Sequence, residues 1–138
     1  MKVPLGVLLS VCIGVAPASA EVVVNVYISS QTMTVEVDGA TLYTWPVSTA
    51  RRGYVTPTGR FQPVRLARVW HSRLYHRAPM PYSVFYDGNF AIHGTNQTRR
   101  IGRPASHGCV RLPTRDAAIL FDLIQSHGFD QAHIVIQD

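Results

Sequence analysis

The chain has 138 residues, of which 46% are hydrophobic and 15% are charged. That length suffices for one compact domain and is too short for two, and the hydrophobic content is too high for a disordered protein. The 9 prolines and 10 glycines favour a fold with many turns and argue against a helical bundle or a coiled coil.

Residues 1–20 have the pattern of a secretory signal peptide. Lys2 gives a positive start, Val3–Val15 is mostly apolar, and Ala18-Ser19-Ala20 puts small residues where a signal peptidase reads. The apolar run is shorter than the ~20 residues that span a bilayer. We therefore expect cleavage after Ala20, and a domain over residues 21–138 that is periplasmic or secreted, without stable membrane insertion.

The basic residues of the predicted domain are all arginine. Lys2 is the one lysine among the 13 basic residues, which leaves 12 arginines against 8 acidic residues. The planar guanidinium group suits carboxylates and phosphates. For an exported protein, an acidic polymer such as cell-wall peptide is a better partner than nucleic acid, so we expect no nucleic-acid binding.

The domain also keeps a single cysteine. Cys12 lies in the leader, so Cys109 has no partner for a disulfide within the domain. A lone thiol in an oxidising compartment is either buried and inert or used in chemistry, and its neighbours decide between the two.

Most of the expected elements are strands, because their residues are β-branched or alternate in polarity. In chain order we expect strands at Glu21–Ile28, Met33–Val37, Thr41–Ser48, Phe61–Val69, Ser83–Tyr86, Asn89–His93, Val110–Leu112 and His133–Ile136. Asp38–Gly39 and Asp87–Gly88 are expected hairpin turns. The segments Arg51–Arg60, Trp70–Pro81 and Thr95–Ala105 are expected loops.

One helix is expected near the C-terminus, over about Asp116–Ser126. Thr114 is its expected N-cap and Gly128 its expected stop. The residues at helical spacing that should face the core are Ala117, Leu120, Phe121 and Ile124. The sequence therefore predicts a mostly β domain, a sandwich or barrel-like sheet with one main helix.

A polar, glycine-rich segment surrounds the lone thiol. Cys109 follows Gly108 directly, and His93 lies sixteen positions upstream at the end of a predicted strand. A thiol attacks carbonyls as a thiolate, which a nearby imidazole supplies by taking the proton. The backbone N–H groups of Gly108 and Cys109 are candidates to face a developing oxyanion. This pattern favours cleavage or transfer of acyl groups.

Three other interpretations stay open at this point. Cys109 can be a structural thiol, and His93 a strand histidine with no catalytic role. His93, His107 and Cys109 can also supply three ligands to a metal such as zinc. The third interpretation is an inactive module that only binds the cell wall.

The residues around Cys109 resemble a known signature. His93-Gly94-Thr95 followed by the run Ser106–Leu112 is similar to the L,D-transpeptidase (YkuD-type) catalytic domain family. The loop Thr56–Phe61 and the tripeptide Met80-Pro81-Tyr82 also fit that family. The similarity covers about Val22–Asp138, and it implies the family's β fold and no cofactor.

The resemblance implies a cysteine acyltransferase of peptidoglycan. Such enzymes attack the carbonyl of an L-centred residue, usually diaminopimelate, in a stem tetrapeptide, release the terminal D-amino acid and form a thioester. The expected partners are peptidoglycan stem peptides, with a second stem, the lysine of an outer-membrane lipoprotein, a free D-amino acid or water resolving the thioester. The alternative with water is a hydrolase, either an L,D-carboxypeptidase or a lipoprotein–peptidoglycan amidase.

The resemblance also implies roles for the residues of the motif. Cys109 is the nucleophile, and His93 is the base in preference to His107. The carbonyl of Gly94 orients the His93 ring, and the N–H groups of Gly108 and Cys109 form the oxyanion hole. The residues expected to support the pocket are His107 and Ser106.

Substrate contacts are expected from Arg111, Tyr82 and Met80. Arg111 suits a substrate carboxylate through two parallel hydrogen bonds, or it pairs with an acidic residue of the chain such as Asp116. The remaining histidines are expected at the surface or in packing, namely His71, His76, His127 and His133.

Overall fold

The computed structural model describes residues 1–4, 6–14 and 21–138. The predicted cleavage site at Ala18–Ala20 lies outside the described residues. Residues 1–4 and 6–14 are exposed and belong to no helix or strand. In the described ranges, no helix has the length and apolar character needed to cross a membrane.

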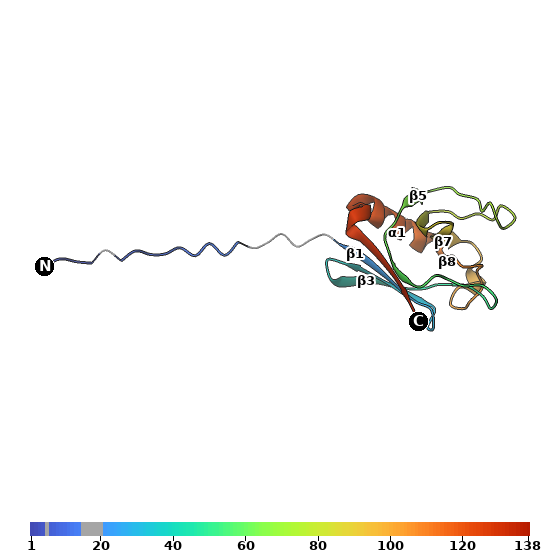
Figure 1. The fold of residues 1–138 in the computed structure, drawn as a ribbon, viewed down its shortest axis with the longest axis horizontal. Coiled ribbons are helices and arrows are strands. Elements are labelled where there is room, and N and C mark those ends of the chain that lie inside the picture. Colours follow the sequence, from blue (N-terminus) through green and yellow to red (C-terminus); the bar gives the residue numbers. More distant parts are fainter. Residues whose placement is uncertain (5, 15–20) are drawn as a thin grey trace.

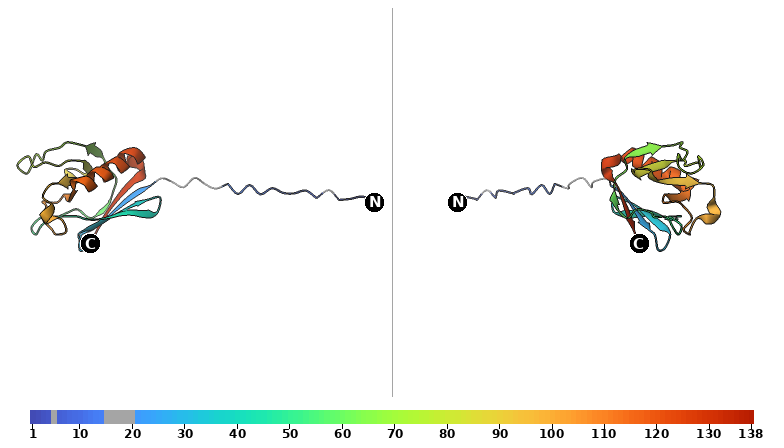
Figure 2. Two further views of the ribbon diagram at one scale, coloured as in Figure 1. Left: turned by 180° about the vertical axis from the view of Figure 1, so that it is seen from behind. Right: turned by 45° about the vertical axis from the view of Figure 1, so that its right-hand side comes forward.

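Two β-sheets and a helix build the domain (Figure 1). The five-stranded sheet has the order β3 (Ala40–Pro46), β2 (Thr32–Val37), β1 (Val22–Tyr27), β9 (Ala132–Gln137) and β4 (Gly59–Phe61). The four-stranded sheet has the order β5 (Arg65–Ala67), β6 (Ser83–Asp87), β7 (Phe90–Thr95) and β8 (Val110–Pro113). Figure 2 shows the same arrangement of layers from two further directions. The predicted mostly β fold is confirmed.

The main core lies where both sheets and the helix meet. Alternate residues of β1 point into it, as the β-branched run predicts, because successive side chains of a strand face opposite sides. The fully buried residues of this core include Val22, Val24, Val26, Met33, Val35, Ile92, Leu112, Leu120 and Ile134. A smaller cluster of Met80, Phe85 and Ala91 lies on the other side of the four-stranded sheet and packs against Cys109.

Two parallel strand pairs fix the geometry of the site. β1 pairs with β9 in parallel and ties the N-terminal strand of the domain to the C-terminal strand. β7 pairs with β8 in parallel, with Ile92 opposite Val110 and His93 opposite Arg111. Because Cys109 immediately precedes β8, this register places the thiol at the start of the strand next to the one that carries His93.

The helix α1 (Thr114–His127) is the one α-helix of the described ranges, beside the short 3₁₀ helices η1 (Thr98–Arg100) and η2 (Phe129–Gln131). Its buried side is the predicted stripe of Ala117, Leu120, Phe121 and Ile124. Gly128 ends it, and the Gly128 N–H donates to the Ile124 carbonyl at 2.9 Å. The helix lies against β7 and β8, so it supports the sheet that carries the site.

Three local predictions are wrong. Phe61–Val69 is not one strand: β4 joins the five-stranded sheet and β5 joins the other, and the buried Pro63 between them cannot donate to a ladder. Thr114 is the first helical residue rather than the N-cap, and its hydroxyl donates to Asn96 Oδ1 at 3.2 Å. Asp87 pairs with Phe90, so the second hairpin turns at Gly88–Asn89 and not at Asp87–Gly88.

Candidate active site

Ser106 holds the backbone of the segment that presents the thiol. Its side chain is fully buried, its hydroxyl donates to the Cys109 carbonyl at 2.6 Å, and it accepts from the Gly108 N–H at 3.0 Å. Its own N–H donates to the Thr49 carbonyl. A hydroxyl that bonds its own neighbours in this way closes a tight turn, which fixes where the Cys109 side chain leaves the backbone.

The turn requires glycine at position 108. Gly108 has φ of +135°, a conformation that side-chain-bearing residues rarely adopt. A Cβ placed there would lie 2.5 Å from Phe90 Cε1 and 2.9 Å from the Val55 carbonyl oxygen. The glycine before the thiol therefore serves close packing of the turn against two neighbouring segments.

The thiol of Cys109 is partly buried and is protonated at neutral pH. Burial raises the pKa of Cys109, although the Ala91 backbone N–H and the charge of Arg111 oppose that shift. In this structure the thiol donates to the Asn89 carbonyl oxygen over 3.8 Å, a long contact even for sulfur. At neutral pH the thiol is thus uncharged, and it needs a base to become reactive.

His93 carries a neutral imidazole that is held in one orientation. Its side chain in β7 is only 5% exposed, and burial is the main reason that its pKa falls to about 4. Nδ1 donates to the Gly94 carbonyl at 2.8 Å, and since a carbonyl only accepts, the proton sits on Nδ1. The unprotonated Nε2 is therefore the atom that can take a proton. The predicted contact between His93 and the Gly94 carbonyl is present.

Gly94 also lets the helix approach this strand. A Cβ at Gly94 would lie 2.9 Å from Thr114 Cα, at the first residue of α1. The backbone contact fixes the carbonyl that orients His93 against the start of the helix. The histidine is thus held by the packing of β7 on α1.

His107 is surrounded on several sides and is not free to act as a base. Arg51 Nη2 donates to His107 Nε2 at 2.7 Å, so this nitrogen already accepts a hydrogen bond. The Tyr75 ring stacks on His107 with centroids 4.0 Å apart, and the Tyr54 ring meets it edge-on at 4.7 Å. Burial, followed by the charges of Arg51 and Arg111, lowers the pKa of His107. His107 therefore joins the thiol segment to two neighbouring loops.

Arg111 extends from β8 beside His93 and is half-buried. Burial is the main cause that lowers its pKa, and the nearby guanidinium groups of Arg100 and Arg51 lower it further. In the described part of the chain its side chain forms no ion pair, so the predicted alternative of a bond to Asp116 is wrong. A half-buried guanidinium among other cations is a ready partner for an anion.

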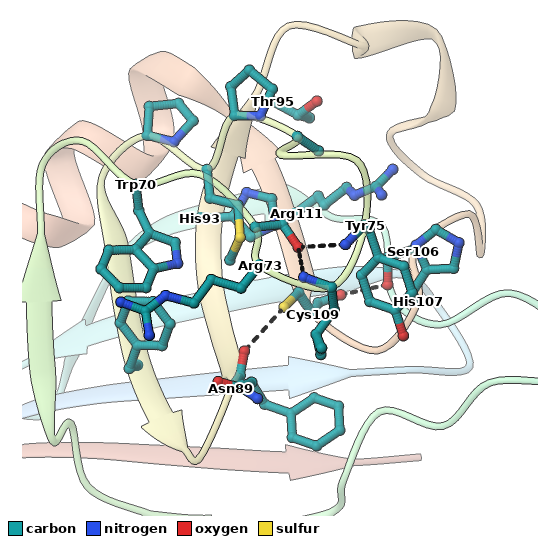
Figure 3. Close-up of a pocket in the computed structure, with 18 of the residues that line it drawn as sticks. Trp70, Arg73, Tyr75, Asn89, His93, Thr95, Ser106, His107, Cys109 and Arg111 are labelled. Atoms are coloured by element: carbon teal, nitrogen blue, oxygen red, sulfur yellow. Dashed lines mark hydrogen bonds between the residues drawn. The ribbon is translucent and has the colours of Figure 1, made fainter.

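These residues share one pocket of about 470 Å³ (Figure 3). Cys109 and His93 line it, together with the predicted residues Ser106, His107, Arg111 and Met80. Its apolar walls include Trp70, Leu74, Phe85 and Phe90. This volume is in the range of small-molecule and peptide sites, and apolar walls with a few convergent polar groups are typical of them.

The structure corrects two predicted site residues. Tyr82 does not line the pocket; its ring packs edge-on against Phe121 of α1, with centroids 5.7 Å apart. The Gly108 N–H donates to the Ser106 hydroxyl and so is not available to an oxyanion in this structure. For the Cys109 N–H, by contrast, no hydrogen-bond partner is found within the described residues.

The three proposed metal ligands do not form a metal site. Nowhere in residues 1–4, 6–14 and 21–138 do three histidine, cysteine or acidic side chains gather as a ligand set. His107 Nε2 instead faces the cationic Arg51. A guanidinium in that position repels a metal ion, so the metal alternative is contradicted by the geometry.

Sequence reasoning missed the pocket wall formed by residues 70–80. Trp70, Arg73 and Tyr75 all line the pocket, yet they lie in a segment that has no hydrophobic period and contains Pro79. The signal available was the combination of large aromatic residues with arginines in a loop, which is unusual for a purely connecting segment.

Comparisons with known proteins agree with this geometry. The model of the L,D-transpeptidase catalytic domain (YkuD) matches residues 20–134. YkuD of Bacillus subtilis, an L,D-transpeptidase by name, is 25% identical over 105 residues, which are 73% of this chain and 59% of that protein. YbiS of Escherichia coli K12, also an L,D-transpeptidase by name, is 37% identical over 70 residues, or 51% of this chain and 18% of that protein. The chain thus spans less than two thirds of the length of each of these curated relatives.

Solved structures share the fold. An L,D-transpeptidase from Mycobacterium smegmatis has a TM-score of 0.77 at 24% identity, over 86% of this chain and 59% of that one. An L,D-transpeptidase from Stackebrandtia nassauensis has a TM-score of 0.75 at 24% identity, over 94% of this chain and 61% of that one. LdtMt1, solved with imipenem, has a TM-score of 0.75 at 25% identity, over 86% of this chain and 59% of that one. With a family model matched over residues 20–134 and the same fold in solved members, this chain belongs to the L,D-transpeptidase catalytic domain family.

Proposed function

We propose that this protein is a peptidoglycan L,D-transpeptidase in which Cys109 carries the acyl group as a thioester. One observation carries the proposal: the thiol and a neutral, oriented imidazole line the same pocket, the imidazole on β7 and the thiol on the residue just before the parallel neighbour β8. Nucleophile and base within one site are the minimum for this chemistry. The family membership supports the choice of an acyl transfer over other uses of a thiol.

In the first half-reaction the thiol turns from the Asn89 carbonyl towards His93. Nε2 of His93 takes the proton while the sulfur forms a bond to the carbonyl carbon of the donor peptide. The oxyanion is held by the free N–H of Cys109. The bond from that carbon to the terminal D-amino acid then breaks, and His93 returns the proton to the leaving amine. The enzyme is left as a thioester with neutral His93.

In the second half-reaction an acceptor resolves the thioester. The amine of the acceptor loses its proton to His93 and forms a bond to the thioester carbon, and the bond from that carbon to sulfur breaks. The sulfur leaves as a thiolate and takes that proton from His93, which restores the neutral thiol and the neutral imidazole. A second stem peptide, an outer-membrane lipoprotein lysine or a free D-amino acid gives transfer, whereas water gives hydrolysis. We propose transfer to an amine as the main outcome, since family members are named for it.

The electrostatics favour proton transfer during the reaction over a preformed ion pair. Burial raises the pKa of Cys109 and lowers that of His93 to about 4, so at neutral pH both groups are uncharged. The thiolate forms only as the proton moves to His93, when a carbonyl is in place. A thiol that is neutral at rest also resists adventitious oxidation in an oxidising compartment.

Arg111 and Met80 are the proposed substrate contacts nearest the reacting groups. Arg111 is positioned to hold a carboxylate next to the scissile bond, because its side chain is half-buried and forms no ion pair in the described ranges. Met80 is 7% exposed and contributes apolar floor to the pocket. The positively charged, apolar-walled site is suited to an anionic peptide.

The proposal is tested by incubating the purified protein with a disaccharide-tetrapeptide, with and without an acceptor amine, and analysing the products by mass spectrometry. Transfer product should form with wild type and vanish in Cys109→Ala. His93→Ala should lower the rate by about 10² to 10⁴, the usual range for a general base, and His107→Ala by much less. A crippled His107→Ala beside an active His93→Ala would reverse the assignment of the base.

We also propose that residues 1–20 are removed on export to the periplasm. The support is the residue pattern that ends at Ala18-Ser19-Ala20. Expression in a bacterial host followed by cell fractionation and N-terminal sequencing should give a periplasmic protein that begins at Glu21. A cytoplasmic protein that retains Lys2 would contradict it.

A further inference from the structure

A loop between β5 and β6 forms one wall of the pocket, and we call residues 70–80 the arm. The Met80 N–H donates to the Trp70 carbonyl at 2.8 Å, and the Ser72 N–H donates to the Ala78 carbonyl at 2.9 Å. His71 and Pro79 form a bridge between these two bonds. The arm is therefore built like a narrow hairpin, and its residues have defined positions over the pocket.

The arm presents a stack of guanidinium and aromatic groups. Arg65 Cζ lies 4.3 Å from the centroid of the Trp70 ring and 4.2 Å from that of Phe85. Arg73 Cζ lies 5.2 Å from the Trp70 centroid. Figure 3 shows the Arg73 side chain lying along Trp70, on the side of the pocket away from His107. Stacking on a ring occupies the face of a guanidinium and leaves the N–H groups along its edge free to donate.

Neither guanidinium of the stack pairs with a carboxylate of the described residues. In the described ranges the ion pairs are Arg68 with Asp122 and His133 with Glu21, so neither Arg65 nor Arg73 has one. Of the acidic residues only Asp87 lines the pocket, and it forms none of these pairs. The pocket therefore has two separate cationic groups, Arg111 next to the reacting thiol and Arg73 on the arm.

Two cationic groups at different places along one pocket indicate a ligand with more than one negative charge. Arg111 is on β8, two residues after the nucleophile, and is assigned above to a carboxylate beside the scissile bond. Arg73 belongs to a different element, the arm, and is held against Trp70, so we assign it to a separate anion. A planar carboxylate that receives two parallel N–H bonds is the anion that best fits the edge of a guanidinium.

We propose that Arg73, held on Trp70, is a second carboxylate subsite, so that the enzyme selects donor peptides with a further free carboxylate over the same peptides with that carboxylate amidated. The inference rests on the proposed function. A carboxamide has the same shape as a carboxylate but carries no charge and offers one acceptor oxygen, so it loses the ion pair and one hydrogen bond. Arg73 thereby determines specificity and takes no part in bond making.

The test compares two donor tetrapeptides with the same sequence. In one peptide the carboxyl groups outside the terminal residue are free carboxylates, and in the other they are carboxamides. The measured quantity is the rate of thioester formation on Cys109, followed by intact-protein mass spectrometry without acceptor. Wild type should prefer the free carboxylate by about tenfold, the scale of a charge-assisted pair at a partly open site. The preference should shrink when salt rises from 0.05 to 0.5 M, because Arg73 is exposed and its field is screened.

Arg77 supplies a matched control on the same arm. It is an exposed arginine of the arm that does not line the pocket. Arg73→Gln should lower acylation by the carboxylate peptide about tenfold, affect the carboxamide peptide far less, and so remove the preference. Arg73→Lys should keep part of the preference, because a lysine keeps the positive charge but cannot donate two parallel hydrogen bonds to one carboxylate. Arg77→Gln should keep the wild-type preference.

Other results of these acylation assays would overturn either the Arg73 subsite or the proposed function. Equal acylation of wild type by the two peptides, or an equal loss in Arg77→Gln and Arg73→Gln, would overturn the subsite while leaving the proposed function intact. A preference that is seen only when an acceptor is added would overturn its assignment to the donor peptide. No acylation of folded wild type by either peptide would overturn the proposed function and the subsite with it.

Discussion

Acidification to about pH 4 should switch the enzyme off, and the reason is the burial of His93. A general base must be neutral to take the thiol proton. His93 is 5% exposed, and burial lowers its pKa from the ordinary 6.5 to about 4. Activity should therefore be lost as pH falls through about 4, far below the range in which a solvated histidine titrates.

The size of the effect follows from these two values. At pH 5.5 a histidine with a pKa of 6.5 is about 10% neutral, whereas one with a pKa of about 4 is roughly 97% neutral. The rate constant kcat/KM for acylation should thus be nearly flat between about pH 5.5 and 7. Arg111 contributes to the shift through its charge, so Arg111→Gln should raise the pH midpoint while it also weakens substrate binding.

The assay is the rate of Cys109 acylation between about pH 3.5 and 8, read by intact-protein mass spectrometry. Circular dichroism at each pH separates loss of catalysis from loss of the fold. An acid limb with its midpoint near 6.5 would refute the reasoning, because it would mean that His93 is solvated before the substrate binds. If the pH midpoint of acylation is the same in Arg111→Gln as in wild type, the charge of Arg111 does not lower the pKa of His93.

The remaining predictions concern stability, the turn and the thiol. The free energy of unfolding should fall by on the order of 3 kcal/mol between pH 6.5 and 4, because the unfolded state binds a proton on His93 in that pH range and the folded state does not. Urea titrations at both pH values measure this difference, and His93→Phe should make the free energy of unfolding less dependent on pH. Gly108→Ala should slow acylation by about 10²-fold, because the added Cβ meets Phe90 and displaces the Cys109 sulfur by a fraction of an ångström or more. Stopped-flow kinetics measures the loss of rate, and an unchanged rate would show that the turn adapts to the extra methyl group. Leu120→Ala should cost about 2 to 5 kcal/mol in a guanidinium titration, because the side chain is fully buried. A carbapenem should add one drug mass to wild type and none to Cys109→Ala in an intact-mass measurement.

The parts of the fold that could be predicted are those with a local cause. The β-branched run that forms β1 and the helical spacing of Leu120 and Ile124 each define an element on their own. His93 and Cys109 were identifiable because a lone thiol after glycine with an upstream histidine is a rare pattern. The sequence does not state that β7 and β8 pair in parallel, yet that pairing brings these two residues together.

The parts that could not be predicted depend on distant contacts. Trp70 and Arg73 reach the pocket because the arm folds back on itself through backbone bonds that any residues could make. The Gly108 N–H is taken by Ser106, which depends on how one turn closes. Tyr82 lies two residues from Met80, but it turns to Phe121 of the helix while Met80 lines the pocket. These side-chain positions depend on packing between residues far apart in the chain, so the sequence pattern around each residue does not predict them.

Trapping the acyl-enzyme shows whether Cys109 carries the acyl group. The protein is mixed with a disaccharide-tetrapeptide without acceptor, quenched in acid, digested and sequenced by mass spectrometry. We expect one thioester adduct, on the peptide that contains Cys109, with the mass of the donor less its terminal D-amino acid. An adduct on any other residue, or product formed by folded Cys109→Ala, would contradict it.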